Sequence, residues 1–282
     1  MRPGRAERAL VLGDDLGVFL AVARSLGRRG IEVHVVTDEP DAPGLASNYV
    51  GSVHPMPVYA GDGSGWEGFL RELIEEHEFD FVIPCSDSDL VRLDRHSDGL
   101  GRERLAISNP EALAVFTDKE KTRALAGRTG VPTAEGGPLL AGETAQRLAA
   151  RLGLPLVLKP SASYRVGDRQ AKRYAHIVRT AEEIERLLAS APRSHWLAEA
   201  FFDGEGIGVS VLAEAGRVKL AAQHRRLRTL SETGGSSVRR AERVEPALLR
   251  DAEALAQATA LTGVAMFEFR RNAGCGRHVL IE

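Results

Sequence analysis

The chain has 282 residues, of which 43% are hydrophobic and 27% are charged, and its formal net charge is −2 at pH 7. These values are typical of globular proteins and exclude a disordered or fibrous chain, and the length favours two or three packed units. A net charge this small gives no general attraction to nucleic acid or to an anionic membrane, so neither is an expected partner. Any anionic ligand has to be held by local groups of basic side chains.

Cysteine usage and the N-terminus indicate the compartment. Cys85 and Cys275 are the two cysteines, and without a CxxC pair or a His-rich neighbour they predict neither a disulfide framework nor a zinc site. Residues 1–13 run from a short basic stretch into a strand pattern, and no window approaches the ~18 apolar residues of a membrane span. The sequence therefore predicts a soluble, cytoplasmic protein.

Apolar runs and helical patterns alternate through the first hundred residues, which is typical of βαβ units around a parallel sheet. The patterns predict strands at 9–13, 32–36 and 79–84, and helices at 16–27 and 69–77. We therefore expect a Rossmann-like first domain over residues 1–112.

The loop after the first strand, VLGDDLG, lacks the glycine spacing of a dinucleotide fingerprint. Asp14 and Asp15 would also place two carboxylates where a pyrophosphate lies, which disfavours a cofactor site. The alternatives are a tight turn with aspartate caps, or an edge that faces an amine-bearing substrate.

The pattern changes after the first domain, and residues 113–282 form a predicted second domain of the α+β class. Helices are expected from Pro110, which can occupy a first helical position, and at 118–127, 145–152, 181–189 and 246–261. Strands are expected at 156–159, 175–179, 196–200, 208–213, 217–223, 264–270 and 278–282. Most of them are joined as hairpins, which predicts an antiparallel sheet.

Two segments of this domain carry residues suited to a nucleotide. Lys159 ends an apolar strand, VLKP, and a polar loop, SASYRVGD, follows it and could fold over phosphates. A surface lysine is the alternative, but only five of the 37 basic residues are lysines, which favours a specific role. The segment LAEAFFDGEGIGVSV could be a hinge whose backbone and Glu199 bind the edge of an adenine ring. The alternative is a simple β-hairpin.

Glu268 and Glu282 each end an apolar strand run, AMFEF and VLIE. If these strands pair as a hairpin, both carboxylates can project to one face and hold a hard divalent cation. The alternative is a salt bridge to Arg270 or Arg226.

Taken in order, the segments TDKEKTRALAGRTGVPT, LPLVLKP, SASYRVGD, LAEAFFDGEGIGVSV, VAMFEF and VLIE resemble the ATP-grasp superfamily over essentially the whole chain. The stretch HRRLRTLSETGGSSV is most similar to its carboxylate-amine ligase branch, which includes D-aspartate ligase and related amino-acid ligases. The resemblance implies a Rossmann-like pre-ATP-grasp domain followed by a two-lobed ATP-grasp domain, with a small lobe at about 113–197 and a large lobe at about 198–282.

The resemblance also implies roles for particular residues. Lys119 and Lys159 would contact the phosphates of ATP beneath a loop that includes Ser161, Ser163 and Gly167. Glu199 and the backbone near Phe202 would recognise adenine, and Glu205 would bind the ribose.

The remaining implied roles concern the metal and the substrate. Glu268 and Glu282 would bind Mg²⁺, with Mn²⁺ as an alternative. Arg226 and Arg228 would steady the acyl phosphate or the carboxylate, and the 233–237 loop would approach the substrate.

This sequence departs from the family pattern at two places. The ribose carboxylate is displaced by one position, and the family motif continues after the second metal glutamate with an asparagine and an arginine, so the resemblance implies a large lobe that is incomplete at its C-terminus.

The expected activity is ATP-dependent formation of an amide from a small carboxylate and an amine, through an acyl phosphate. Amino acids are the expected substrates. A homodimer is one expected assembly. Two alternatives remain: a non-catalytic nucleotide- or substrate-binding module, and a nicotinamide-dependent oxidoreductase, which rests on the first βαβ layer alone.

Overall fold

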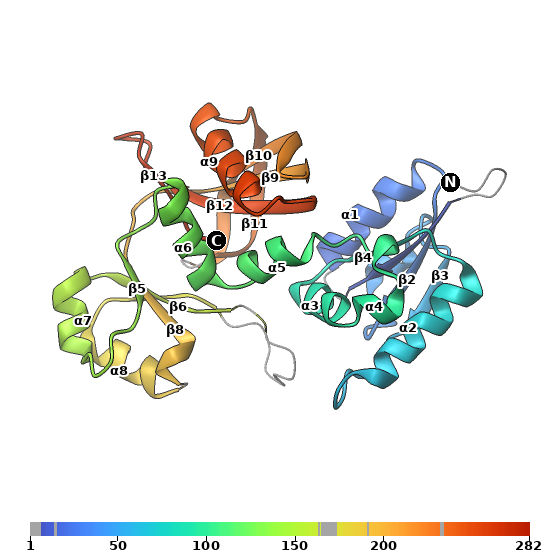
Figure 1. Ribbon diagram of the computed structural model, residues 1–282, viewed down its shortest axis with the longest axis horizontal. Coiled ribbons are helices and arrows are strands. Elements are labelled where there is room, and N and C mark those ends of the chain that lie inside the picture. Colours follow the sequence, from blue (N-terminus) through green and yellow to red (C-terminus); the bar gives the residue numbers. More distant parts are fainter. Residues whose placement is uncertain (1–6, 14–15, 163, 165–173, 191, 232–233) are drawn as a thin grey trace. The chain divides into compact units, whose positions relative to one another are not determined.

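A computed structural model describes residues 7–13, 16–162, 164, 174–190, 192–231 and 234–282 of the chain (Figure 1). These residues form two compact units, which meet in sequence between Ile107 and Ser108. The boundary that the sequence predicts, at residue 112, lies within helix α5 (Pro110–Phe116). No helix among the described residues is both long and apolar enough to cross a membrane.

The first unit is built on a four-stranded sheet in the order β3-β2-β1-β4, and its neighbouring strands are parallel. Helix α1 packs on one face through Phe19, and helix α2 packs on the other face through Trp66 and Leu70. The parallel sheet predicted from the alternating pattern is therefore confirmed. Its elements are β1 (Arg8–Leu12), α1 (Leu16–Gly27), β2 (Glu32–Thr37), η1 (Pro43–Ala46), β3 (Ser52–Pro55), α2 (Ser64–His77), β4 (Phe81–Pro84), α3 (Asp87–Arg95), α4 (Ser97–Leu100) and η2 (Arg102–Arg104).

The second unit contains two separate antiparallel sheets. The first has the order β5-β8-β6-β7, and helices α7 and α8 pack on it around Leu148, Ile184 and Leu158. Its elements, with the helices before it, are α5, α6 (Lys119–Thr129), β5 (Gly136–Pro138), α7 (Ala145–Leu152), β6 (Leu156–Pro160), β7 (His176–Val178), α8 (Ala181–Ala189), η3 (Arg193–His195) and β8 (Trp196–Ala200).

The other sheet of this unit has the order β11-β10-β9-β12-β13. Helix α9 and residues of α5 and α6 share one core with this sheet, in which Leu255, Leu125 and Phe267 are buried. Its elements are β9 (Glu205–Glu214), β10 (Arg217–Ser231), β11 (Gly234–Glu242), α9 (Pro246–Ala258), β12 (Gly263–Arg271) and β13 (His278–Leu280).

Two sequence-based expectations are wrong in this unit. Strands β8 and β9 belong to different sheets, so the hairpin interpretation of LAEAFFDGEGIGVSV fails and residues 201–204 instead connect the two sheets. Strand β10 runs to Ser231 rather than to residue 223, and it pairs with β11, a strand that the sequence did not predict. The arginine-rich continuation of β10 carries no apolar alternation by which a strand could be recognised.

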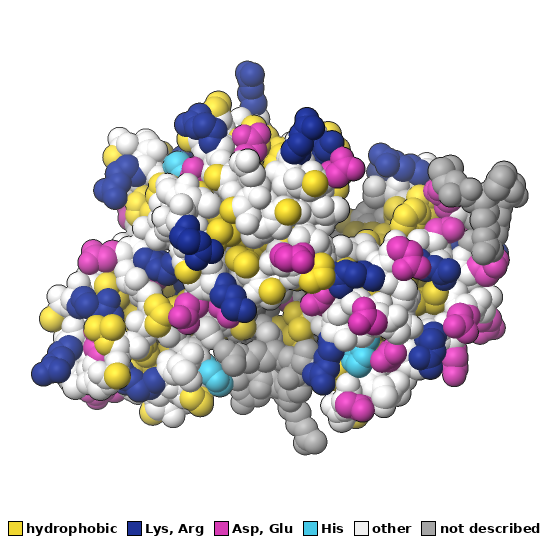
Figure 2. All heavy atoms as spheres, viewed as in Figure 1, with side chains coloured by type: hydrophobic (Ala, Val, Ile, Leu, Met, Phe, Trp, Pro, Cys, Tyr) yellow, Lys and Arg dark blue, Asp and Glu magenta, His cyan; other side chains and the backbone are white. Residues whose placement is uncertain are grey.

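Basic and acidic side chains intermingle on the face of the molecule shown in Figure 2. Such mixing agrees with the formal net charge of −2. The described side chains on that face do not gather into a broad patch of one sign.

Candidate active site

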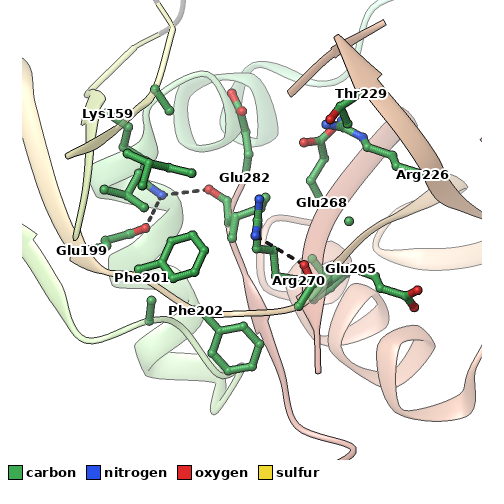
Figure 3. Close-up of a pocket in the computed structure, with 18 of the residues that line it drawn as sticks. Lys159, Glu199, Phe201, Phe202, Glu205, Arg226, Thr229, Glu268, Arg270 and Glu282 are labelled. Atoms are coloured by element: carbon green, nitrogen blue, oxygen red, sulfur yellow. Dashed lines mark hydrogen bonds and ion pairs between the residues drawn. The ribbon is translucent and has the colours of Figure 1, made fainter. Parts of the chain in front are cut away.

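The second unit contains a cavity of about 500 Å³, lined by both of its sheets and by the start of α6 (Figure 3). A volume of this size is common for small-molecule sites. Nine of the residues predicted from the sequence line it: Lys119, Lys159, Glu199, Phe202, Glu205, Arg226, Arg228, Glu268 and Glu282. Segments more than 160 residues apart in the chain are thus brought to one place, as in the Lys119–Glu282 contact with a separation of 163.

Two lysine side chains are buried at one side of this cavity. Lys119 is the first residue of α6, where Asp118 caps the helix through the backbone amides of residues 120 and 121. Lys159 lies in β6, in a strand of otherwise apolar residues. The two residues are only 9% and 7% exposed, so both ammonium groups have lost most of their contact with water. Such burial is costly unless each charge has partners.

Glu199 of β8 supplies the main counter-charge, and it is itself only 5% exposed. Its two carboxylate oxygens lie 2.8 Å from Lys159 Nζ and 3.0 Å from an Arg123 guanidinium nitrogen. Lys159 Nζ also donates to the Ile281 carbonyl at 2.9 Å. Burial lowers the pKa of Lys159 below its ordinary value, and the attraction of Glu199 opposes that shift.

Arg123 was not predicted as a site residue. It lies one helical turn after Lys119 on α6, and residues four apart share one face of a helix. This spacing was the available signal, and it becomes informative only once Lys119 is assigned to the site.

Glu268 and Glu282 also line the cavity, and Figure 3 shows Glu282 between Lys159 and Glu268. Strand β12 pairs with β13 as predicted, and Glu268 N donates to Glu282 O at 2.7 Å. In Figure 3 the two carboxylates point in the same direction. Glu282 accepts from Lys119 Nζ at 2.6 Å, and Glu268 accepts from the guanidinium of Arg226. The salt bridge considered for Glu268 thus exists and involves Arg226, while its role as a metal ligand stays a prediction.

Comparison with known proteins places this geometry in a fold family. No protein-family model matches the sequence. A D-alanine–D-alanine ligase of Ralstonia nicotianae is 28% identical over 210 residues, which are 74% of this chain and 53% of that protein. An L-amino acid ligase structure from Bacillus licheniformis superposes with a TM-score of 0.70 at 18% identity, covering 99% of this chain and 66% of that one.

A second solved structure with a similar fold is the biotin carboxylase domain of the Hydrogenobacter thermophilus 2-oxoglutarate carboxylase, solved with ADP, its magnesium salt and bicarbonate. Its TM-score is 0.72 at 18% identity, covering 98% of this chain and 63% of that one. The chain has the ATP-grasp fold of these proteins. It spans about half the length of the ligase from Ralstonia and about two thirds of the two solved structures.

Within this ATP-grasp fold, the connection between the two sheets forms one apolar wall of the cavity. Phe201 and Phe202 both line the cavity, and Figure 3 shows their rings below Lys159. The guanidinium of Arg270 lies 5.6 Å from the centre of the Phe201 ring. Arg270 follows Glu268 by two residues on β12, and this strand spacing puts both on one face. Burial lowers the pKa of Arg270 from its ordinary value.

Two arginines hold the carboxylate of Glu205 in this structure. Its oxygens lie 2.7 Å from Arg225 and 3.4 Å from Arg271. The next residue, Gly206, faces the cavity side, because a Cβ built there would lie 3.1 Å from Cδ of Arg226. Binding of ribose by Glu205 stays a prediction, and a ribose hydroxyl would compete there with two guanidinium groups.

The structure describes some of the remaining predicted site residues and not others. Arg226 and Arg228 both line the cavity, although a register shift interrupts β10 between them, so strict strand alternation does not hold there. Ser161 is buried next to β6, and its carbonyl accepts from the amide of Lys119 at 2.8 Å. Ser163, Gly167 and Thr233 lie outside the described residues. The prediction of a loop at 233–237 is wrong from residue 234 onward, because β11 (Gly234–Glu242) begins there.

Proposed function

We propose that this protein is an ATP-dependent carboxylate-amine ligase that forms an amide through an acyl phosphate and releases ADP and phosphate. The observation that carries the proposal is the convergence of Lys119 and Lys159, both buried, with the carboxylates of Glu268 and Glu282 on one cavity. The ligase names of the Ralstonia and Bacillus relatives support the reaction class.

The buried lysines fit a polyphosphate. Without a ligand, Lys159 is balanced by Glu199 at 2.8 Å and Lys119 by Glu282 at 2.6 Å. A nucleotide phosphate would add negative charge beside two ammonium groups from which water is largely excluded, where the attraction is stronger than in bulk solvent. The base would lie against the apolar wall that contains Phe201 and Phe202, with the backbone near Phe202 reading its edge.

Two of the carboxylates that line this cavity fit Mg²⁺. Glu268 and Glu282 offer carboxylate oxygens, which are the ligands that Mg²⁺ and Mn²⁺ prefer. Their present partners, Arg226 and Lys119, show that each carboxylate is already paired with a positive charge. A bound Mg²⁺ would neutralise charge on the transferring phosphoryl group.

The protein's own residues would act by position and charge. A carboxylate oxygen of the acid substrate attacks the γ-phosphorus of ATP, and the bond from that phosphorus to ADP breaks. An amine then attacks the acyl carbon and phosphate leaves, so that an amide forms and the amine loses a proton. Lys159 and Lys119 would hold the nucleotide phosphates, and the guanidinium groups of Arg226 and Arg228 would hold the acid carboxylate and then the acyl phosphate. No side chain has to act as a covalent nucleophile.

The test is a reaction with Mg·ATP and a panel of amino acids, offered in pairs as acid and amine. Release of ADP together with an amide product is expected. AMP and pyrophosphate would show an adenylating enzyme instead, and ATP binding without turnover of any pair would favour a non-catalytic nucleotide-binding module.

A further inference from the structure

Three histidine rings meet in the first unit, apart from the candidate active site. His34 lies on β2, His54 on β3, and His77 at the end of α2. His34 Nδ1 lies 3.0 Å from His54 Nε2. Each of the three rings offers a nitrogen, and these nitrogens all lie within 4.8 Å of one another.

The sheet register explains why these rings meet. Val36 pairs with His54 across β2 and β3, and His34 lies two residues before Val36, so His34 and His54 project from the same face. Val36 packs in the core beneath α2, which identifies that face as the one that α2 covers. The last residue of α2 is His77, and its ring centre is 4.9 Å from that of His34 and 5.3 Å from that of His54.

A carboxylate fixes the protonation pattern of the buried member. His34 is only 4% exposed, and its Nε2 lies 3.1 Å from Glu32 Oε1. Because a carboxylate accepts, Nε2 of His34 carries the proton, and in the neutral ring Nδ1 is left as the acceptor. In that tautomer Nδ1 accepts from His54 Nε2, and its lone pair points toward the cluster.

We propose that His34, His54 and His77 form a binding site for a divalent transition-metal ion of the Zn²⁺ class, with Glu32 orienting His34. Imidazole nitrogens suit such ions, and a carboxylate behind one of them is the usual way in which a protein fixes the ligand ring. His54 would move its proton from Nε2 to Nδ1 when the ion binds, and the His34 hydrogen bond would give way to two metal bonds.

The observed geometry is close to what the ion requires. Two nitrogens at 2.0–2.1 Å from a tetrahedral Zn²⁺ are about 3.3 Å apart. The His34–His54 nitrogens are 3.0 Å apart, so this pair needs a movement of only a few tenths of an ångström. The three nitrogens lie within 4.8 Å of one another, and the ring of His77 would move closer when the ion binds. The pKa of His54 is lowered by burial and by repulsion from His34 and His77, against an opposing attraction from Glu76, which favours the neutral ring that a metal needs.

The competing interpretation is that the three rings only stack and hydrogen-bond around Phe79, which lies 5.0 Å from His34 between ring centres. In that case no ion would bind more tightly here than elsewhere on the surface. The sequence gives no signal for either interpretation, because 20 residues separate His34 from His54 and no zinc-site spacing is present.

The test uses the whole chain, freed of metal with a chelator and titrated with Zn²⁺ in excess Mg²⁺ by calorimetry. One Zn²⁺ per chain is expected, and His54→Ala should abolish that binding event. His195→Ala, which changes a histidine outside the cluster, is the matched control and should bind as the parent does. Glu32→Gln should weaken binding by about 10- to 100-fold.

Direct evidence comes from X-ray absorption of the Zn²⁺ complex, where three nitrogen ligands at about 2.0–2.1 Å are expected. Circular dichroism checks that the His54→Ala chain folds, and His77→Asn gives a second test if it does not. Absence of one-to-one binding by the parent chain, or unchanged Zn²⁺ binding in the folded His54→Ala and His77→Asn variants, would overturn the proposal.

Discussion

The ammonium of Lys159 is buried between the Glu199 carboxylate and the Ile281 carbonyl, at 2.8 and 2.9 Å. Lys159→Met keeps much of the side-chain length and removes the charge. We expect ATP affinity to fall at least about 30-fold. In the proposed complex Lys159 pairs with a phosphate, and removing one partner of such a buried charge pair across a binding interface costs about 2 kcal/mol or more. Equilibrium titration with Mg·ATP measures this. Lys219→Met, at a lysine that is 44% exposed and pairs with Glu214, is the control and should leave affinity unchanged.

The lowered pKa of Lys159 predicts that nucleotide binding takes up protons. Burial lowers its pKa, so the fraction of molecules with a deprotonated Lys159 becomes appreciable at a pH below the ordinary lysine pKa of about 10.4. Phosphate binds the charged form, so nucleotide binding raises this pKa again and takes up protons. Affinity should therefore fall as the pH rises through the interval between the lowered pKa and the ordinary one.

Calorimetry above about pH 8, where ordinary histidines are neutral, in buffers of different ionisation heat measures this uptake. Lys159→Arg keeps the charge but does not titrate in this range, so its uptake should disappear. Equal uptake by both proteins would contradict the assignment to Lys159.

Single residues differ in how far the sequence reveals them. Lys159 and Glu268 end apolar strand runs, where a charged residue is conspicuous, and both line the cavity. Arg123 and Arg270 are less conspicuous in a chain rich in arginine, and helical or strand spacing relates them to the site only after Lys119 and Glu268 are assigned. The three-histidine cluster depends on pairing between distant strands, which residue types alone do not encode.

At the scale of elements, helices with a clear apolar stripe were the easiest part to predict, whereas α3 was not expected. Helix α7 and helix α8 have the predicted bounds, because each has an apolar stripe and a threonine cap, Thr144 or Thr180. The connection between β8 and β9 was ambiguous because glycine and aspartate suit a hairpin turn and a crossing between sheets equally well. Pairing with β6 and β12 decides between them, and those contacts are distant in sequence.

Strand β5 contains a glycine whose replacement should destabilise the protein. Gly136 pairs with Glu199, has a φ of +133°, and a Cβ there would lie 2.1 Å from the Ala198 carbonyl oxygen. Gly137 has a similar φ of +146°, but its nearest neighbour is 3.7 Å away. Gly136→Ala should therefore lower the free energy of unfolding by about 1–3 kcal/mol more than Gly137→Ala. Urea denaturation of both variants measures the difference, and equal losses would show that the contact is not present in solution.

At the scale of the whole molecule, alternation of apolar and helical patterns predicted a parallel sheet in the first unit, and hairpin spacing predicted antiparallel pairing in the second. The sequence did not indicate that the second unit holds two separate sheets, because the order of strands depends on long-range hydrogen bonds. The resemblance to ATP-grasp proteins implied a division of this unit into two lobes, whose bounds stay a prediction.

The most direct measurement is a crystal structure of the protein with Mg²⁺ and a non-hydrolysable ATP analogue. We expect phosphate oxygens within hydrogen-bond distance of Lys119 and Lys159, and a Mg²⁺ at about 2.0–2.1 Å from carboxylate oxygens of Glu268 and Glu282. An analogue bound away from these four side chains would contradict the proposed function.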